Sequence, residues 1–296
     1  MTMIRTIVAA TDFSPGSHAA VERAVQPTEA HGASRCLLHA FDVSAWHSLK
    51  GVFDPQRLTM RPPPDLRMQR RLSDLIATLA TLATLAGIEV EARFSIGSAH
   101  SAINMYVTAH APSLVVLGSR AEPAMPGLGS TALKVLRSPA CPMLIVRSTK
   151  SRPCAKVLSA VDMRDGLVRA ARAAIRLFPA AHQHLLHAVD PTLELALWMG
   201  DVAKEQIRLL HDSMYTKALR QLAQLAQELT READHQVGAE VVGDVAAQAI
   251  VEHAAALPAD CMAVGRHGEG TVAERVFGNM AQQVLHHGLR DVLVVP

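Results

Sequence analysis

The chain repeats its own apolar segments in the same order and at a nearly constant offset. The four repeated pairs are TIVAATD (6–12) with KVLSAVD (156–162), LLHAFD (37–42) with LLHAVD (185–190), SLVVLGSR (113–120) with DCMAVGRH (260–267), and PMLIVR (142–147) with DVLVVP (291–296). Chance similarity would not preserve both order and spacing, so the pattern predicts two copies of one domain. Differences of function are then to be sought where the copies diverge.

Length and composition agree with two globular domains. A chain of 296 residues suits two domains of about 150 residues, each large enough for a core of its own. We place these domains at residues 1–148 and 154–296, joined by the polar segment RSTKSRP at 147–153. The formal net charge is only +2 and no basic run carries interleaved aromatic residues. We therefore expect no nucleic-acid partner.

The sequence also predicts a cytoplasmic protein. The first strand-like segment begins near Ile4, which leaves no room for a signal peptide. No apolar run approaches the roughly 20 residues that span a bilayer, so no membrane segment is expected. The four cysteines include no CxxC pair and lie mostly inside apolar segments. This arrangement indicates buried thiols in a reducing compartment.

Each copy reads as five short strands alternating with helices. The expected strands are residues 4–10, 35–41, 88–95, 113–118 and 142–147 in the first copy, and 156–161, 184–189, 237–242, 260–265 and 291–295 in the second. Two leucine series at helical spacing predict core-facing helices, namely Leu72, Leu75, Leu79, Leu82 and Leu85, and Leu219, Leu222, Leu225 and Leu229. Continuous apolar strands separated by helices predict an α/β protein of two tandem doubly wound, five-stranded parallel-sheet domains of Rossmann-like type.

The second copy carries a glycine loop directly after its fourth strand. Gly265 and Gly268 are followed after nine residues by Gly278, Asn279 and an apolar helix. Glycines allow close backbone approach to a phosphate, and we expect Asn279 to cap a helix whose free amides favour an anion. The loop lies where doubly wound sheets bind ligands, so it predicts a phosphate site. No GK[ST] motif is present, which argues against efficient phosphoryl transfer.

With these motifs the chain resembles the universal stress protein family, in its tandem form, over nearly the whole length. The family pattern G-x2-G-x9-G is met by Gly265, Gly268 and Gly278, and its strand-closing acid by Asp12 or Asp162. The resemblance implies bound ATP, with Mg²⁺ as an open question, and dimers formed through the last strand. It implies a role in stress survival that is regulatory and not enzymatic. Carried onto this chain, it implies a site at Val161, Asp162, Val189, Val264, Gly265, His267, Gly268, Gly278, Asn279 and Met280. Asn279 and Ala281 stand where the family usually has hydroxyl residues, which alters two phosphate contacts.

The first copy departs further from this pattern. Ala121 replaces the second glycine, Pro123 and Pro126 remove amide donors, and Gly129-Ser130 comes two residues early. Alanine resists positive φ, so this loop is a poorer phosphate cradle. We expect Ser130 still to cap its helix. We interpret the copy as a retired site kept as a folding and pairing partner, which joins the second copy through the last strands 142–147 and 291–296 and so protects their edges. A different ligand there, and a further homodimer, stay open.

The remaining polar residues predict no catalytic or metal centre. His184 and His187 should face opposite sides of one strand, and His39 and His187 are equivalent repeat positions, which suggests a shared structural task. His286 and His287 suit a helix C-terminus. Trp46 and Trp198 lie in comparable segments after the second strands, where packing is the default interpretation. The alternatives to a nucleotide-binding regulator are a nucleotide-independent scaffold, a metal-binding stress protein and a slow ATPase.

Overall fold

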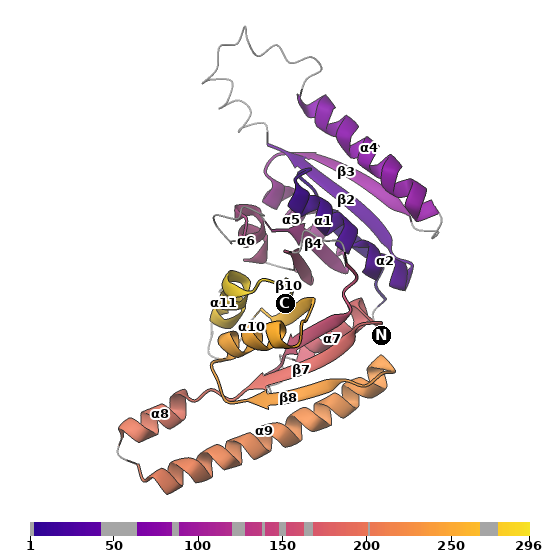
Figure 1. Cartoon of the computed structure of the whole chain (residues 1–296). Helices are drawn as coiled ribbons and strands as arrows, with labels where there is room; N and C mark the ends of the chain where they lie inside the picture. Colours follow the sequence, from indigo (N-terminus) through magenta and orange to yellow (C-terminus); the bar gives the residue numbers. More distant parts are fainter. Residues whose placement is uncertain are drawn as a thin grey trace, which may run out of the picture. The chain divides into compact units, whose positions relative to one another are not determined.

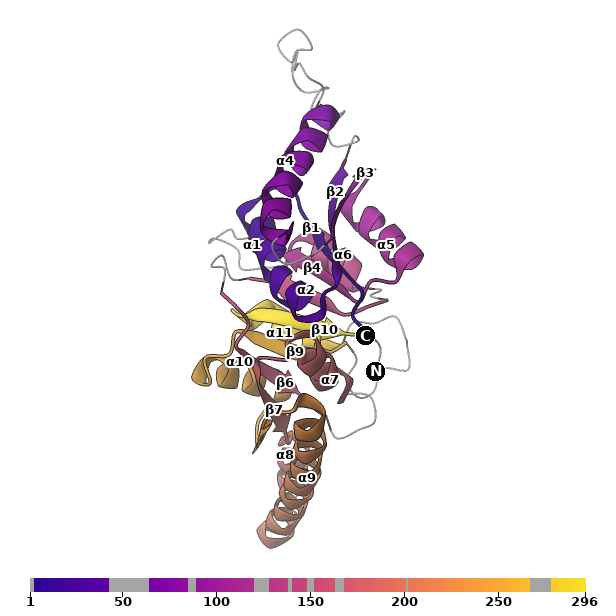
Figure 2. The same cartoon turned by 90° about the vertical axis from the view of Figure 1, so that its right-hand side faces the viewer.

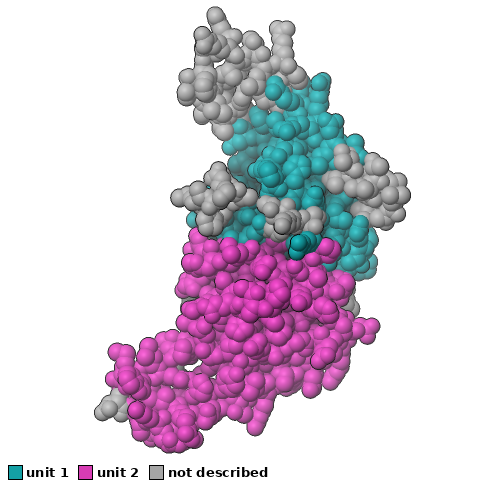
Figure 3. All heavy atoms as spheres, in the orientation of Figure 1, with its two compact units in different colours: residues 1–152 teal, residues 153–296 magenta. Residues whose placement is uncertain are grey.

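The computed structural model describes nine segments of the chain. They are residues 3–42, 64–84, 89–119, 128–137, 140–147, 152–162, 168–200, 202–266 and 278–296. The chain divides into two compact units, Met1–Arg152 and Pro153–Pro296, which Figure 3 colours teal and magenta. Each unit is described by itself.

Unit 1 is a five-stranded sheet with helices between its strands (Figure 1). Its elements are β1 (Thr6–Ala10), α1 (Pro15–Arg23), α2 (Val25–His31), β2 (Ser34–Phe41), α4 (Pro64–Thr84), β3 (Val90–Ile96), α5 (Ala99–His110), β4 (Leu114–Gly118), α6 (Ser130–Leu136) and β5 (Met143–Val146). The strand order is β3-β2-β1-β4-β5 and the pairings are parallel. Helices α4 and α5 lie on opposite sides of β2 and β3 (Figure 2).

Unit 2 repeats this plan. Its elements are β6 (Lys156–Ala160), α7 (Val168–Leu177), β7 (His182–Ala188), α8 (Thr192–Met199), α9 (Lys204–Ala233), β8 (Gly238–Val242), α10 (Ala246–Ala256), β9 (Cys261–Gly265), α11 (Asn279–His287) and β10 (Asp291–Val295). The strand order is β10-β9-β6-β7-β8, again with parallel pairings. The predicted fold class and all ten predicted strands are therefore confirmed.

The strands form where the sequence has continuous apolar runs, because both faces of each sheet are covered. Every residue of β5, β9 and β10 is buried, as expected for a parallel sheet between two helix layers. The four cysteines are buried and free, as predicted. Among the helices that the structure describes, none is long and apolar enough to cross a membrane.

Both predicted leucine-rich helices form. All four leucines of the second series are described, and the prediction fails for one of them. In α4, Leu72 is 2% exposed and faces the core, while Leu85 lies outside the described residues. In α9, Leu222 and Leu229 are buried, whereas Leu219 is 45% exposed. The prediction for Leu219 was wrong because the buried stripe of α9 enters through Ala218, one residue earlier, and one residue rotates a side chain by about 100° around the helix.

Candidate functional site

The carboxyl ends of β6 and β9 mark the switch of strand order in unit 2. From β6 the chain proceeds outward to β7 and β8, and then returns to β9 on the other side. Ligands of doubly wound sheets bind at this switch. Ser159 pairs with Ala263 in the ladder, so Val161 and Gly265, two residues further along, lie level with one another. The structure thus brings two of the predicted site residues, Val161 and Gly265, to the carboxyl ends of neighbouring strands.

The backbone amides of the two predicted valines are hydrogen-bonded within the sheet at this edge. The Val161 amide donates to Leu186 O (3.0 Å) and the Val189 amide to Val242 O (2.7 Å). Both side chains are buried in the hydrophobic core of unit 2, together with residues of α7 and α9. Asp162 follows Val161 and is partly exposed.

The glycine loop begins and ends at the same place. The Gly278 amide donates to Arg266 O (3.0 Å), and the Arg266 amide donates to Val295 O (2.7 Å). These bonds hold the start of α11 beside the end of β9. His267 and Gly268 lie outside the described residues, so the structure gives no position for them. Val264 and Gly265 are buried inside β9, and Asn279 and Met280 begin α11.

Asn279 does not cap α11. The N-cap is Gly278, with φ −60° and ψ 139°, and no side chain bonds the first turn there. Asn279 is the first helical residue, and its Oδ1 accepts a hydrogen bond from Gln283 Nε2 (3.3 Å). The prediction was wrong because glycine is also favourable at an N-cap, and Gly278, one residue before Asn279, has the extended backbone of that position. Among the described residues, no side chain caps the first-turn amides of α11, which suits an anion.

Arg266 was not singled out from the sequence. It follows Gly265 and is only 9% exposed, so its positive charge is held at the start of the loop. The signal was present in the quoted segment DCMAVGRH, where a cation precedes the second glycine. A buried guanidinium close to a helix N-terminus adds to the positive potential of this edge.

Unit 1 has a cavity of about 440 Å³ at the same edge of its own sheet. The lining includes a carboxylate and several hydroxyl residues above an apolar floor; it is formed by Ala10, Thr11, Asp12, Ser14, Pro15, Gly16, Ser17, Leu38, Ala40, Ala99, Ile103, Leu117, Gly118, Ser119, Gly129, Ser130, Thr131 and Ala132. Sequence reasoning missed the hydroxyl residues, because it weighed the loop of this copy and not the turn after β1. Residues 120–127 of that loop lie outside the described chain.

The turn after β1 is held by its own side chains. The Ser14 amide donates to Asp12 Oδ1 (3.0 Å), and the Ser17 amide donates to Ser14 Oγ (3.2 Å), which caps α1. Burial alone would raise the pKa of the Asp12 carboxyl, but hydrogen bonds from Ser14 and Ser17 outweigh it and hold this pKa below its usual value. Asp12 is therefore ionised at neutral pH and presents a fixed negative charge to the cavity.

Ser130 does not cap α6, contrary to the prediction. Gly129 is the N-cap, and Ser130 is the first helical residue. The physical reason is the same as at Gly278 and Asn279, since a glycine precedes each of the two polar residues. The Ser130 hydroxyl instead belongs to the cavity lining.

The equivalent histidines His39 and His187 make equivalent hydrogen bonds, as the repeat predicted. His39 Nδ1 donates to Thr11 O (2.7 Å) and His187 Nδ1 to Val161 O (2.9 Å), so the two equivalent residues share a structural task. Both tie the second strand of their unit to the chain just after the first strand. Within the described segments, no group of three or more His, Cys, Asp or Glu residues could hold a metal ion.

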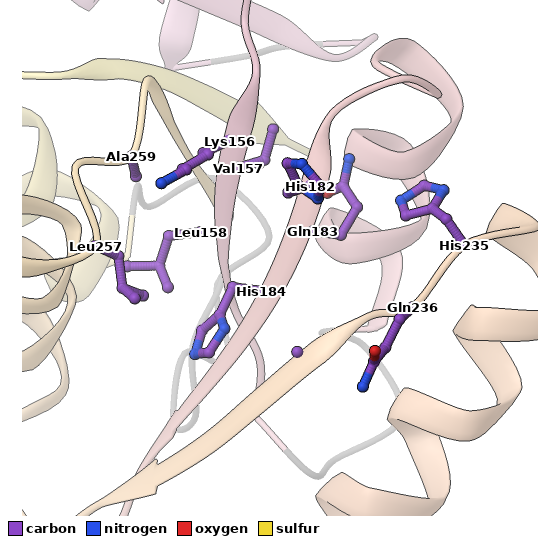
Figure 4. A pocket seen from close by; sticks show the side chains of 11 residues that line it. Lys156, Val157, Leu158, His182, Gln183, His184, His235, Gln236, Leu257 and Ala259 are labelled. Carbon is purple, nitrogen blue, oxygen red and sulfur yellow. The ribbon is translucent and has the colours of Figure 1, made fainter.

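Unit 2 has a cavity, also of about 440 Å³, at the amino ends of β6 and β7 (Figure 4). His184 lines it, on the face of β7 opposite to His187, as predicted. His184 Nε2 is 3.6 Å from Glu240 Oε2, and His253 Nε2 is 3.7 Å from Glu240 Oε1. Burial lowers the pKa of His184, while Glu240 partly opposes this effect. This cavity is at the opposite edge of the sheet from the glycine loop.

The repeated doubly wound sheets and the glycine loop define a tandem α/β protein of Rossmann-like type. Comparison with known proteins identifies its family. The profile of the universal stress protein family matches residues 3–147 and again residues 154–296. The chain belongs to the universal stress protein family and is a tandem member with two such domains. A search of curated proteins finds no significant match.

Solved structures agree on the fold. A universal stress protein from Pseudomonas aeruginosa is 18% identical with a TM-score of 0.63, and the match covers 99% of this chain and 93% of that chain. One from Archaeoglobus fulgidus is 16% identical with a TM-score of 0.64, covering 99% of each chain. A universal stress protein solved in complex with cAMP is 21% identical over 48% of this chain and 95% of that chain, with a TM-score of 0.33.

Proposed function

We propose that unit 2 binds an adenine nucleotide, ATP, and that this chain acts as a nucleotide-responsive regulator in a stress response. The observation that carries the proposal is the hydrogen bond from the Gly278 amide to Arg266 O (3.0 Å). It closes the glycine loop at the switch of strand order, where doubly wound sheets bind ligands. Membership of a family that includes nucleotide binders supplies the choice of ligand.

Each described residue of this edge has a task in the proposal. Asp162 accepts hydrogen bonds from the ribose hydroxyls, as an acid does in related sheets. The amides of Asn279 and Met280 in the first turn of α11 bind the phosphates, and Gly265 and Gly278 let the backbone come close. Val161 and Val189 form the boundary of the adenine part of the site, and Val264 belongs to the same part. His267 and Gly268 complete the phosphate loop.

The proposed role is that of a ligand site and not of an efficient enzyme. The sequence has no GK[ST] motif after β9, so it lacks the lysine and the hydroxyl residue that this motif directs to the terminal phosphates and to Mg²⁺. Mg²⁺ would accompany the nucleotide through the phosphates. The pairing of the two domains through their last strands remains a prediction.

The experiment compares matched acids of the two copies. Calorimetry with ATP should give one site, which Asp162→Ala abolishes and Asp12→Ala leaves unchanged. On the same reasoning Gly268→Val should block binding, whereas Ala121→Val should not. At a ligand concentration one hundred times the dissociation constant, linkage stabilises the fold by about 2.7 kcal/mol, which is visible as a raised melting temperature.

Four outcomes would contradict the proposal. Two equivalent sites, or ATP binding that survives both Asp162→Ala and Gly268→Val, would place the nucleotide elsewhere. Phosphate release near the ~10 per second typical of enzymes, abolished by Asp162→Ala, would make the protein an ATPase. If the protein neither binds ATP nor releases phosphate, the scaffold role is the one that remains.

A further inference from the structure

Strand β3 is an edge strand of unit 1, and within the described residues its outer side is open. It is last in the order β3-β2-β1-β4-β5, and among the described residues of unit 1 no strand pairs with its other side. Figure 2 shows β3 beyond β2, with α4 on one side of the pair and α5 on the other. Glu91 and Arg93 side chains are 46% and 52% exposed, and Ala92 between them is exposed.

The backbone of β3 alternates its hydrogen-bonding groups between β2 and the open side. Arg35 N donates to Glu89 O and Gly97 N donates to Phe41 O, each at 2.9 Å. Odd-numbered residues therefore bond β2. Because successive residues of a strand point their amides and carbonyls in opposite directions, Val90, Ala92 and Phe94 present theirs to the open side. An edge of this kind can accept another strand.

We propose that β3 pairs antiparallel with β3 of a second copy of this chain, about a two-fold axis at Ala92. Such a pair is isologous and closes as a dimer. Ala92 then lies opposite Ala92 of the second copy in a hydrogen-bonded pair, flanked by Val90 opposite Phe94 on each side. These three pairs exchange roughly six backbone hydrogen bonds.

Charge selects this register. Glu91 lies opposite Arg93 of the second copy, and Arg93 opposite its Glu91, at the non-hydrogen-bonded positions where side chains approach most closely. Moving the axis by one residue places Glu91 against Glu91 or Arg93 against Arg93, and like charges directly opposite are destabilising. Charged residues often protect an edge from pairing. Here two opposite charges on either side of Ala92 are complementary to themselves, and they already form a 2.7 Å ion pair within the strand.

The edge strand of unit 2 lacks this property. Strand β8 carries one charged residue, Glu240, between Gly238 and Val242. No antiparallel register of β8 against itself can therefore set opposite charges against one another. Glu240 is instead directed toward His184 and His253 of its own unit. The proposed contact is for this reason specific to unit 1, and it rests on no part of the proposed nucleotide function.

Sedimentation velocity of the full chain tests the proposal. We expect a dimer that Glu91→Arg and Arg93→Glu each weaken by roughly 10- to 100-fold in dissociation constant, since either change replaces two attractive pairs by two repulsive ones. The exchange Glu91→Arg with Arg93→Glu in one chain restores the dimer. Mixing the two single variants also restores it, because their charges are complementary to each other. Glu232→Arg, at the similarly exposed Arg172–Glu232 pair of unit 2, is the matched control and leaves the dimer unchanged.

The outcomes that overturn the proposal are equally direct. We expect a dissociation constant in the micromolar range. If the chain is still monomeric at a protein concentration of about 100 µM, roughly 100 times that constant, the contact does not exist. A dimer that neither single variant weakens uses another surface. Circular dichroism checks that each variant folds, and a mixture of the two variants that fails to associate while both are folded would also refute the register.

Discussion

Replacing Gly118 with alanine should destabilise unit 1 by about 3 kcal/mol, at the upper end of the cost of overpacking. Gly118 ends β4, and a Cβ there would lie 2.3 Å from Gly16 O, 2.5 Å from Gly16 C and 2.8 Å from Ser17 N. Carbon atoms pack favourably at about 3.5–4.0 Å, so the two segments must separate by roughly an ångström. The neighbours are backbone atoms of the first turn of α1, and no side-chain rotation can relieve the contact.

Chemical denaturation measures this cost, with Gly129→Ala as control. Nothing lies within 4 Å of a Cβ at Gly129, so this change loses only the preference of a helix N-cap for glycine over alanine. A Trp198→Phe background leaves Trp46 as the tryptophan of the chain, in unit 1. A loss of about 3 kcal/mol corresponds to roughly 6–12 °C in melting temperature for a unit of this size. If Gly118→Ala and Gly129→Ala differ by less than about 0.5 kcal/mol, within the range of neutral surface changes, the close approach of α1 to β4 is refuted.

Two further predictions concern a helix face and a histidine. Leu222→Ala should lower the unfolding free energy by about 2–5 kcal/mol and Leu219→Ala by less than about 0.5 kcal/mol, since the first is 2% and the second 45% exposed; equal losses in urea denaturation would contradict the observed helix face. Burial holds the pKa of His39 below 6.5, so the unfolded chain binds the proton more readily and stability should fall as pH drops below about 6.5. His39→Gln should reduce this fall between pH 7.5 and 5.5, and an unchanged pH dependence would show that His39 is not its source.

The ten strands could be predicted because their signal is local. A strand buried on both faces needs an unbroken apolar run, and four of the five strands in each unit carry such a run, which repeats at a nearly constant offset. The repeat also predicted that His39 and His187 would act alike. The two bonds to Thr11 O and Val161 O show why: one imidazole ties the second strand to the first in each unit.

Helix starts were less predictable, because they depend on backbone angles at one residue. Both Asn279 and Ser130 follow a glycine, and in each case the glycine is the N-cap. A polar residue next to glycine gives no sequence signal that decides between the two, since both types are common at that position. Leu219 shows the corresponding limit for a helix face, where a one-residue change of the buried stripe exposes a leucine.

The cavity of unit 1 shows that a glycine loop and a ligand cavity are separable features of this fold. The sequence of the first copy was interpreted through its loop, where Ala121 and two prolines argue against a phosphate cradle. The cavity instead depends on the close approach of Gly16 to Gly118, which brings the Asp12–Ser17 turn against the end of β4. A change in the loop alters the phosphate donors without removing that approach. Divergence after duplication can therefore change the loop while the cavity persists, and its lining keeps an ionised carboxylate at Asp12 together with several hydroxyl residues.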